Sequence, residues 1–425
     1  MRNKKRDFIF IQDGKQIPEK LFNEIHEQIS DKDYLVKNEK YIANFVGFII
    51  TKEFVITSLP KHFINNTDEL IESNDALNNA ELLLAVINKY FQSSRNQFIF
   101  ENTERASDSY PFIPFQEVWQ WYKRYGLLIR KSNEYKKGYT GKVNWKQTIS
   151  KSTPVINNNN ILFFPFVVRE TITKFDFISY CMAYVINKTI SIFPFKLNVH
   201  PIELDSSGIE SMKYSEIVSR LKSLRNMTFK NIEVSLINSL ITYFSNENYE
   251  GDTYKLKIYK FSYVWEDILN EYLKYHLIGF LDNGDLVFND KVKNERPYIN
   301  FDYNRSFEDI DESSNKYHIK PDFYSATENT VFIFDAKYYV NVSDLDYKQL
   351  SYHFILSNRR KNTYNYLLLP TVGKYYNKLH FSLSDLYITD VNVVGDLEEE
   401  TENIDTVAIY ESYINMKNAM RKYIQ

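Results

Sequence analysis

The segment from His318 to Lys337 constrains the fold of this chain more than any other part of its sequence. Val331 to Phe334 form a continuous apolar run of β-branched and aromatic residues, too short for a typical helix. This composition predicts a strand that is buried on both faces. Because side chains alternate along a strand, Asp335 and Lys337 should emerge on one face beyond the run, and Ala336 on the other.

A second carboxylate is expected to join this pair. The segment before the strand can pair back antiparallel through a turn at residues 326–329, which brings Asp322 alongside Asp335. Two carboxylates and the ammonium group of Lys337 then converge at one end of the strand. Charges placed directly after a buried strand are costly unless they are paired or bind a metal. The arrangement suits a hard divalent cation with a lysine next to a metal-bound water.

The tripeptide Asp/Glu-x-Lys is uninformative by itself, because it occurs four times in the chain. Only Asp335-Ala336-Lys337 follows an apolar strand-like run and has a Pro-Asp dipeptide upstream at hairpin distance. The alternative interpretation is an edge hairpin with a solvated ion pair. The cost of placing charges after a buried strand favours the functional interpretation.

Pro321-Asp322 followed by Asp335-Ala336-Lys337 resembles the active-site signature of the PD-(D/E)xK nuclease superfamily. The resemblance implies that Asp322 and Asp335 bind Mg²⁺, with Mn²⁺ as a substitute, and that Lys337 orients or deprotonates the attacking water. Mg²⁺ takes one or two carboxylates and keeps several waters, and phosphate oxygens complete its shell. The cation would lower the pKa of a bound water and stabilise charge on the phosphate.

A helix is predicted downstream, over Asp344 to Leu356. Its apolar face contains Gln349, which needs a hydrogen-bond partner that the active site could supply. In RecB-like and McrC-like nucleases a tyrosine follows this glutamine by four residues. Here Tyr352 follows by three and His353 takes the fourth place, a spacing similar to that of the LlaJI-type restriction endonucleases. The resemblance implies a catalytic role for Gln349 and leaves Tyr352 either a site residue or core.

An upstream helix is predicted over Phe261 to Leu273, with Ser262 as its N-cap. In the superfamily a helix at this position often lends a glutamate to the metal site. Trp265-Glu266 resembles the family's Trp-Glu pair, which implies Glu266 as a further metal ligand. The alternative for Glu266 is a solvated surface carboxylate.

Three sections are predicted along the chain, with an α/β fold that is α+β overall. Residues 1–105 read as a small α+β domain for partner docking or DNA contact, and residues 106–250 as a largely helical middle section. Residues 251–425 read as the PD-(D/E)xK endonuclease domain, a mixed central sheet flanked by helices. Within it we expect an extended segment over Tyr387 to Val394 and a closing helix over Thr406 to Ile424.

The pattern Gly141-x-x-x-Trp145-x-x-Thr148-Ile149 again resembles the LlaJI-type and McrC-like endonucleases, in which it precedes the nuclease domain. Basic residues gather around it, although the net charge of the whole chain is −3. We interpret eight of them as candidate DNA contacts: Lys123, Arg124, Arg130, Lys131, Lys136, Lys137, Lys142 and Lys146. The alternatives are a solvated face and a surface for an acidic partner.

Several classes are disfavoured. The single cysteine, Cys181, excludes an intramolecular disulfide and a cysteine-based zinc cluster. The chain has no leader and no apolar run of about 18 residues or more, so we expect a cytoplasmic protein with no membrane contact. It also lacks the GxxxxGK[ST] phosphate-binding loop and therefore carries no nucleotide-driven motor of its own.

We therefore expect a Mg²⁺-dependent DNA endonuclease, similar to a type II or type IV restriction enzyme, that acts in anti-phage defence. Nucleases of this type work with a separate McrB-like AAA+ GTPase or ATPase, so the resemblance implies that partner beside double-stranded DNA. One alternative is a stand-alone repair or recombination nuclease. Another is a DNA-binding or assembly protein with a non-catalytic nuclease fold, against which the intact set of Asp322, Asp335 and Lys337 argues.

Overall fold

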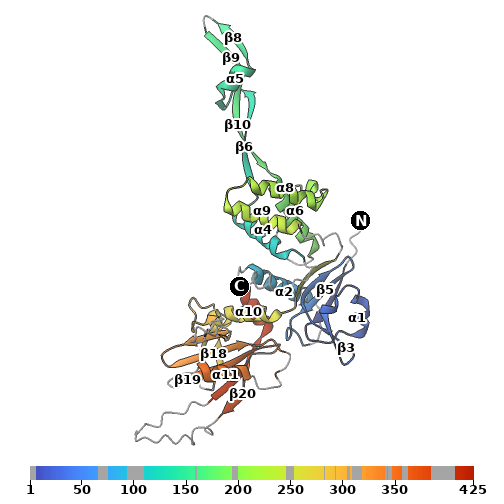
Figure 1. Cartoon of the computed structure of the whole chain (residues 1–425), viewed down its shortest axis with the longest axis vertical. Coiled ribbons are helices and arrows are strands. Elements are labelled where there is room, and N and C mark those ends of the chain that lie inside the picture. Colours follow the sequence, from blue (N-terminus) through green and yellow to red (C-terminus); the bar gives the residue numbers. More distant parts are fainter. Residues whose placement is uncertain are drawn as a thin grey trace. The chain divides into compact units, whose positions relative to one another are not determined.

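The structure is a computed structural model, and two compact units make up the chain: residues 1–110 together with 251–425, and residues 111–250. The residues that it describes are 6–65, 75–92, 110–157, 160–193, 200–245, 253–281, 283–291, 293–303, 307–308, 318–339, 342, 347–356, 362–383 and 407–425. Figure 1 labels the main elements of both units.

The first unit contains a four-stranded sheet that joins three N-terminal strands to a strand from after the second unit. Its order is β1-β5-β4-β11, with β1 at Asp7–Gln12, β5 at Phe54–Leu59, β4 at Val46–Ile50 and β11 at Tyr254–Ile258. β4 and β5 form an antiparallel hairpin, and β1 pairs in parallel with β5. The edge strand β11, which the sequence grouped with the nuclease domain, is therefore part of the N-terminal sheet.

A buried ion pair adds to this connection. Lys257 on β11 places its ammonium group 2.8 Å from the carboxylate of Asp33, and both side chains are buried. The hydroxyl group of Tyr259 donates to the same carboxylate at 2.8 Å. Removing one partner of a buried pair costs about 3–5 kcal/mol. The two segments of the first unit thus share one core.

Short elements complete the N-terminal part of this unit. They are α1 (Glu19–Ile25), the 3₁₀ turn η1 (Asp31–Asp33), β2 (Tyr34–Lys37), β3 (Lys40–Ala43) and α2 (Asp75–Gln92). α1 packs through Phe22 and Ile25 on a core that includes Ile49 and Ile56 of the sheet. This packing fixes the strand ends from which Asp13 and Lys61 emerge.

A six-stranded sheet lies at the centre of the nuclease part of the first unit, and it is mixed, as predicted. Its order is β14 (Asp302–Tyr303), β17 (Phe323–Ala326), β18 (Thr330–Ala336), β19 (Asn362–Thr371), β21 (Val407–Asn415) and β20 (Tyr376–Leu383). β17 and β18 form the predicted antiparallel hairpin, whereas β19 runs parallel to both β18 and β21. Two shorter antiparallel pairs are β12 (Leu277–Phe280) with β13 (Leu286–Phe288), and β15 (Phe307–Glu308) with β16 (His318–Ile319).

Helices α10 (Phe261–His276), α11 (Tyr347–Leu356) and α12 (Met416–Tyr423) pack against these strands. In α10 the indole of Trp265 is fully buried and its N–H donates to the carbonyl of Leu368 on β19 at 3.4 Å. α11 covers the face of the sheet that carries Ile333. The predicted cap is wrong, because Lys260 rather than Ser262 occupies the N-cap of α10.

The predicted closing helix over Thr406 to Ile424 is wrong in its first half. Residues 407–415 form β21 between β19 and β20, and only α12 is helical. Val407, Ile409 and Glu411 are buried, alternating with less buried neighbours. β-branched and aromatic residues in that alternation are typical of a strand. The segment expected to be extended over Tyr387 to Val394 lies outside the described residues.

The second unit joins a helical bundle to a long ribbon. Its helices are α4 (Phe112–Tyr125), α6 (Phe177–Ile192), α7 (Ser207–Glu210), α8 (Tyr214–Asn226) and α9 (Asn231–Phe244). The ribbon pairs β6 (Ile129–Gly138) with β10 (Phe166–Phe175) over their whole length. Between these two strands come β7 (Lys142–Val143), α5 (Trp145–Lys151), β8 (Thr153–Asn157) and β9 (Asn160–Phe164). The helices were predicted and the ribbon was not.

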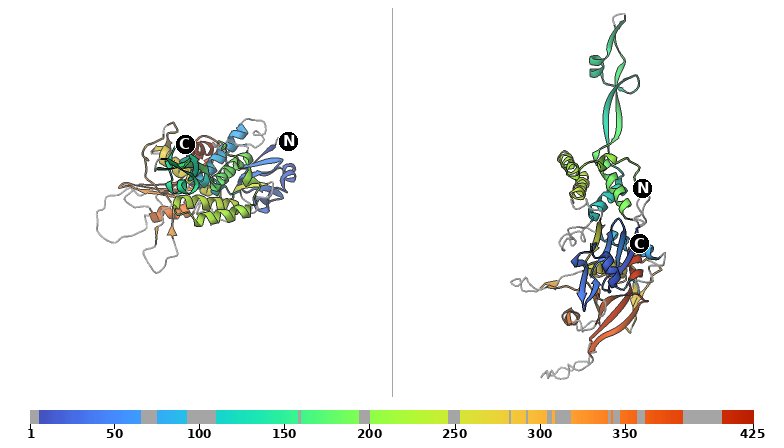
Figure 2. Two further views of the ribbon diagram at one scale, coloured as in Figure 1. Left: turned by 90° about the horizontal axis from the view of Figure 1, so that it is seen from above. Right: turned by 90° about the vertical axis from the view of Figure 1, so that its right-hand side faces the viewer.

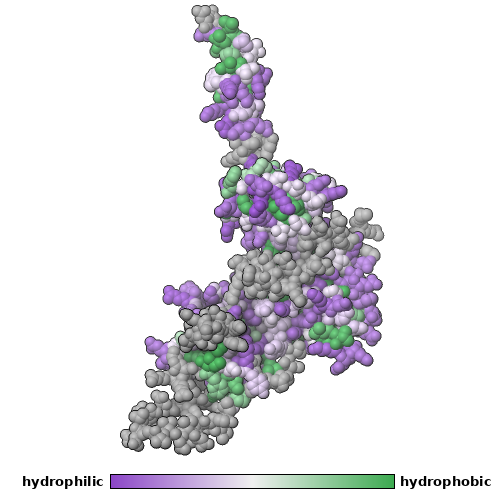
Figure 3. All heavy atoms as spheres, in the orientation of Figure 1, coloured by the Kyte–Doolittle hydropathy of each residue, from purple (hydrophilic) through white to green (hydrophobic). Residues whose placement is uncertain are grey.

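The ribbon leads away from the helices of its own unit and ends in the β8–β9 hairpin, as both views agree (Figures 1 and 2). Hydrophobic residues gather near that end in the space-filling view (Figure 3). Ile156 is 76% exposed and its cross-strand partner Ile161 is 60% exposed. Among the helices of the described residues, none is both long and apolar enough to span a bilayer.

Candidate active site

The hairpin of β17 and β18 places Asp322 and Asp335 together, as the sequence predicts. Its register pairs Phe323 with Phe334, so Asp322, which directly precedes β17, stands beside Asp335 near the end of β18. The apolar run Val331 to Phe334 is buried at every position. The prediction of a strand buried on both faces is therefore confirmed.

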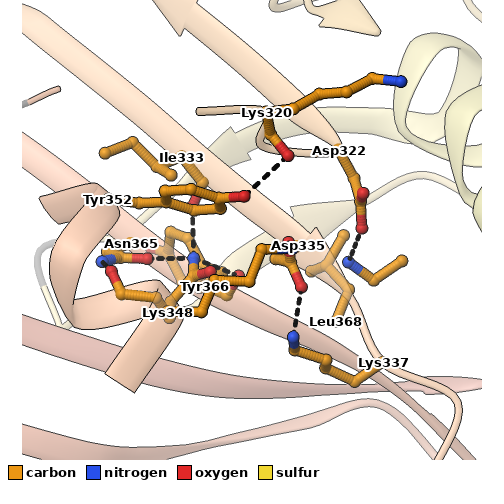
Figure 4. Close-up of polar contacts among 12 residues, drawn as sticks. Lys320, Asp322, Ile333, Asp335, Lys337, Lys348, Tyr352, Asn365, Tyr366 and Leu368 are labelled. Carbon is orange, nitrogen blue, oxygen red and sulfur yellow. Dashed lines mark hydrogen bonds and ion pairs between the residues drawn. The ribbon is translucent and has the colours of Figure 1, made fainter. Parts of the chain in front are cut away.

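Lys337 completes the predicted group. Its ammonium nitrogen lies 2.6 Å from Oδ2 of Asp335, and the two residues are 8% and 2% exposed. The carboxylate of Asp322 accepts a hydrogen bond from the main-chain N–H of Ala336 at 2.7 Å. Figure 4 shows both contacts at the end of the strand. The main-chain N–H of Lys337 donates to the carbonyl of Leu368 at 2.9 Å, which ties this segment to β19.

Burial and the repulsion of neighbouring carboxylates raise the pKa values of Asp322 and Glu266. Burial, followed by the negative charge of Asp335, raises the pKa of Asp322 to about 7. Burial, followed by the charges of Asp322 and Asp335, raises the pKa of Glu266 to about 8. Glu266 is thus close enough to sense both aspartates. A divalent cation would relieve this repulsion, which is the property expected of a metal site.

The pair Asp322 and Asp335 fits Mg²⁺, which prefers oxygen ligands and needs only one or two carboxylates from a protein. Among the described residues, no group of three or more His, Cys, Asp or Glu side chains is close enough together to hold a metal ion. Glu266 therefore senses the aspartates without forming a three-carboxylate cluster in this arrangement. Its role as a ligand stays a prediction.

Lys348 is a site residue that the sequence did not identify. Its ammonium group lies 3.4 Å from Oδ1 of Asp335 and 5.1 Å from the centre of the Tyr352 ring. The side chain is 54% exposed, so its charge faces the solvent beside the aspartate. Its position four residues before Tyr352, on the same face of the helix, could have identified it. The Asp-x-Lys tripeptide that ends at Lys348 was given no weight, because this pattern occurs four times in the chain.

Gln349 lies on the predicted face of α11 and is fully buried. Its amide nitrogen donates to the side-chain oxygen of Asn365, and to the carbonyls of Ile333 at 3.4 Å and Tyr366 at 3.3 Å. The side-chain amide of Asn365 donates in return to the carbonyl of Gln349 at 3.1 Å. These contacts join α11 to β18 and β19. A catalytic role for Gln349 stays a prediction.

Tyr352 and His353 of α11 are both buried. The hydroxyl group of Tyr352 donates to the carbonyl of Lys320 at 2.8 Å, two residues before Asp322 (Figure 4). Tyr352 also packs on Val331 and Ile333 in the core. Burial lowers the pKa of His353 to about 4, so this histidine is neutral at pH 7.

A pocket of ≈ 400 Å³ opens onto the site within the first unit. Its lining combines the N-terminal sheet with the nuclease sheet: Asp13, Asn44, Lys61, Tyr259, Lys260, Phe261, Ser262, Asp322, Asp335, Ala336, Lys337, Tyr338, Tyr339 and Lys348. Nothing in the sequence connects Asp13 or Lys61 with Asp335, because they reach the site only through the fold. The candidate site is therefore built from segments that are far apart in the sequence.

The candidate DNA contacts all belong to the second unit, whereas the carboxylates belong to the first. Among them, Arg130 lies 2.7 Å from Asp176 and Lys136 lies 2.6 Å from Glu170. The side chain of Lys131 is outside the described residues. The others, which are exposed, are Lys123, Arg124, Lys137, Lys142 and Lys146. Their contact with DNA stays a prediction.

A model of the LlaJI restriction endonuclease family matches residues 45–353, more than half of the sequence. The search of curated proteins found no match. A similar solved structure is the refined half-complex from a tetradecameric assembly of Thermococcus gammatolerans McrB AAA+ hexamers with bound McrC. It is 13% identical, with 98% of each chain covered and a TM-score of 0.42.

Proposed function

Because the chain belongs to the LlaJI restriction endonuclease family, we propose that it is the Mg²⁺-dependent DNA-cleaving subunit of a restriction system. The observation that carries the proposal is the group of Asp322, Asp335 and Lys337 beside the 400 Å³ pocket. Buried carboxylates with a neighbouring lysine are suited to hydrolysis of a phosphodiester bond.

In the proposed mechanism, Asp322 and Asp335 would hold the cation, with Glu266 as a candidate further ligand. When bound, the cation would lower the pKa of a water and neutralise charge on the phosphate. The N–H of Ala336 holds the Asp322 carboxylate in place. Lys337 keeps its ammonium group beside Asp335 and orients the attacking water through its remaining N–H donors. The exposed ammonium group of Lys348 attracts a phosphate oxygen.

Double-stranded DNA is the proposed substrate, and the basic residues of the second unit are its proposed contacts. Lysine and arginine side chains on phosphate groups give affinity without sequence preference. The exposed ammonium groups of Lys137, Lys142 and Lys146 suit that role. We place the protein in the cytoplasm, where it would meet incoming DNA.

The proposed partner is a McrB-like AAA+ nucleotide hydrolase, because the sequence lacks a phosphate-binding loop of its own. The exposed apolar pair Ile156 and Ile161 at the end of the ribbon is the proposed docking surface. Solvent-exposed apolar groups of this kind are favourable only when a partner covers them.

Plasmid cleavage by the purified chain, with and without a candidate McrB-like AAA+ protein, tests the proposal. We expect poor cleavage by the chain alone and strong activation by the partner with nucleotide. Efficient, sequence-specific cleavage by the chain alone would instead establish a stand-alone nuclease. No cleavage under any of these conditions would contradict the nuclease assignment.

A further inference from the structure

We infer that the N-terminal sheet positions the catalytic lysine: Asp13, Lys61 and His62 hold Tyr338 and Tyr339, the residues that follow Lys337. The inference rests on the proposed nuclease function and adds positioning residues to it. These three residues do not touch the reacting groups; they act through the backbone beyond Lys337.

Successive residues of the two segments contact one another. The main-chain N–H of Lys61 donates to the hydroxyl oxygen of Tyr338 at 2.7 Å, and the ammonium group of Lys61 donates to the carbonyl of Tyr338 at 3.4 Å. The next residue, His62, places Nε2 2.8 Å from the carbonyl of Tyr339. Three contacts thus join residues 61–62 to residues 338–339, which are far apart in sequence.

The ring of Tyr338 is enclosed. It is 7% exposed, the ammonium group of Lys61 lies 4.6 Å from its centre, and the ring of Phe261 lies 5.4 Å away. These neighbours restrict the position of the Tyr338 ring. The peptide immediately after Lys337 is therefore fixed by its side chain as well as by its carbonyl.

Asp13 and Lys61 are themselves held by the ends of two parallel strands. β1 and β5 end in register, with Gln12 opposite Leu59. The N–H of Asp13 donates to the carbonyl of Leu59 at 2.9 Å, and the side-chain amide of Gln12 donates to the carbonyl of Pro60 at 3.0 Å. The ammonium group of Lys61 lies 3.8 Å from the Asp13 carboxylate, which also shares a hydrogen bond with Tyr338.

The backbone of His62 supports the same conclusion. Its φ of 57° is in the left-handed region, which is uncommon for a residue other than glycine. Such backbone conformations persist where contacts with the surrounding structure stabilise them. Here the conformation accompanies the contact of the imidazole with Tyr339.

Lys337 is consequently fixed on two sides. Its own N–H bonds to Leu368 of the nuclease sheet, and the next two residues bond to the N-terminal sheet. The ammonium group of Lys337 must stay at its 2.6 Å separation from Asp335. Misplacing a reacting group by about 1 Å can cost about 10²-fold in rate.

The variant Tyr338→Phe tests this role against Tyr272→Phe as a matched control. Both tyrosines are buried in the first unit, and each hydroxyl group bonds to an aspartate, Asp13 or Asp290. Tyr338→Phe should lower the single-turnover cleavage rate at saturating DNA about tenfold. The affinity for DNA in Ca²⁺ should stay unchanged. The control should change neither quantity.

Hydrogen exchange of the peptide that contains residues 336–339 gives a readout that does not need cleavage. Tyr338→Phe should speed exchange there, and Tyr272→Phe should not. In a second pair, His62→Ala should slow cleavage, whereas His62→Gln should restore the rate because its amide can donate to the same carbonyl. Equal exchange in the two tyrosine variants would overturn the inference, whether or not the wild-type protein cuts. Absence of wild-type cleavage would overturn only the proposed function.

Discussion

The end of β18 and the end of the β6–β10 ribbon depart from the usual distribution of side chains in opposite ways. At the end of β18, Asp335 and Lys337 are buried. At the end of the ribbon, Ile156 and Ile161 are exposed. Charged residues are seldom buried unless they are paired, and contiguous exposed apolar surface marks binding sites. We therefore propose the chemistry for the first unit and the partner binding for the second.

The two regions also differ in how firmly the structure constrains them. Around Lys337, contacts arrive from β19 and from the N-terminal sheet. The side chains of Ile156 and Ile161 pair with one another across a two-stranded hairpin. Substitutions in the first region should therefore affect catalysis and stability, whereas those in the second should affect partner binding alone.

The largest effect is expected from removing the cation at the end of β18. Chelation should reduce cleavage by more than about 10³-fold, because a bound metal both activates the water and neutralises charge. Ca²⁺ should support DNA binding but little cleavage, since its looser coordination orients a water poorly. Plasmid cleavage and DNA binding in each cation measure this. Full activity in a chelator would show that cleavage does not need a metal ion.

A change of pH should show how much the burial of the Asp13 carboxylate lowers the free energy of unfolding. Burial raises the pKa of Asp13 from 3.8 to about 6, so the folded state holds this proton more tightly than the unfolded state. This group stabilises the fold below about pH 4, and that contribution is lost as the pH rises through about 6. The loss amounts to about 3 kcal/mol.

The variant Asp13→Asn isolates this contribution. The free energy of unfolding of the wild-type protein should fall relative to that of the variant between pH 4 and pH 7. Urea unfolding at several pH values measures the difference. Parallel curves for the two proteins would show that Asp13 titrates normally in the folded state.

At the end of the ribbon, the double variant Ile156→Asp with Ile161→Asp should weaken activation by the AAA+ partner 10- to 100-fold, as expected for about 1–3 kcal/mol of lost contact. The melting temperature and basal cleavage should stay unchanged, because both side chains are exposed. Ile232→Asp, at a residue of α9 that is 55% exposed, is the matched control. Normal activation of the double variant would place the docking surface elsewhere.

The smallest effect is expected at Gln349. Gln349→Ala should lower the free energy of unfolding by about 1–2 kcal/mol, because it removes the buried hydrogen bonds that Gln349 donates to Asn365 and to the carbonyl of Ile333. Thermal unfolding and cleavage below the melting temperature separate the two roles. A strong loss of turnover at unchanged stability would establish the catalytic role instead.

The sequence predicted the parts of the site that depend on local patterns. The buried strand at Val331 to Phe334, its hairpin, and α10 and α11 all follow from hydrophobic periodicity over a few residues. The convergence of Asp322 and Asp335 follows from strand register. These features needed no knowledge of distant segments.

The missed features depend on distant contacts or lack a hydrophobic pattern. Asp13 and Lys61 reach the pocket only because the fold brings the residues that follow β1 and β5 beside Tyr338. The β6–β10 ribbon was missed because the side chains described along β6 are largely exposed, which removes the alternation that identifies a strand. In β21 the alternation was present, but it was interpreted as part of a helix.

The most direct test of the central claim is DNA cleavage in Mg²⁺ by the variants Asp335→Asn and Lys337→Ala, assayed with the partner present. Each variant should lose cleavage while staying folded at the assay temperature and keeping its DNA affinity in Ca²⁺, and its melting temperature should fall because a buried ion pair is broken. That result would assign the reaction to the end of β18. Wild-type cleavage by either folded variant would contradict the account.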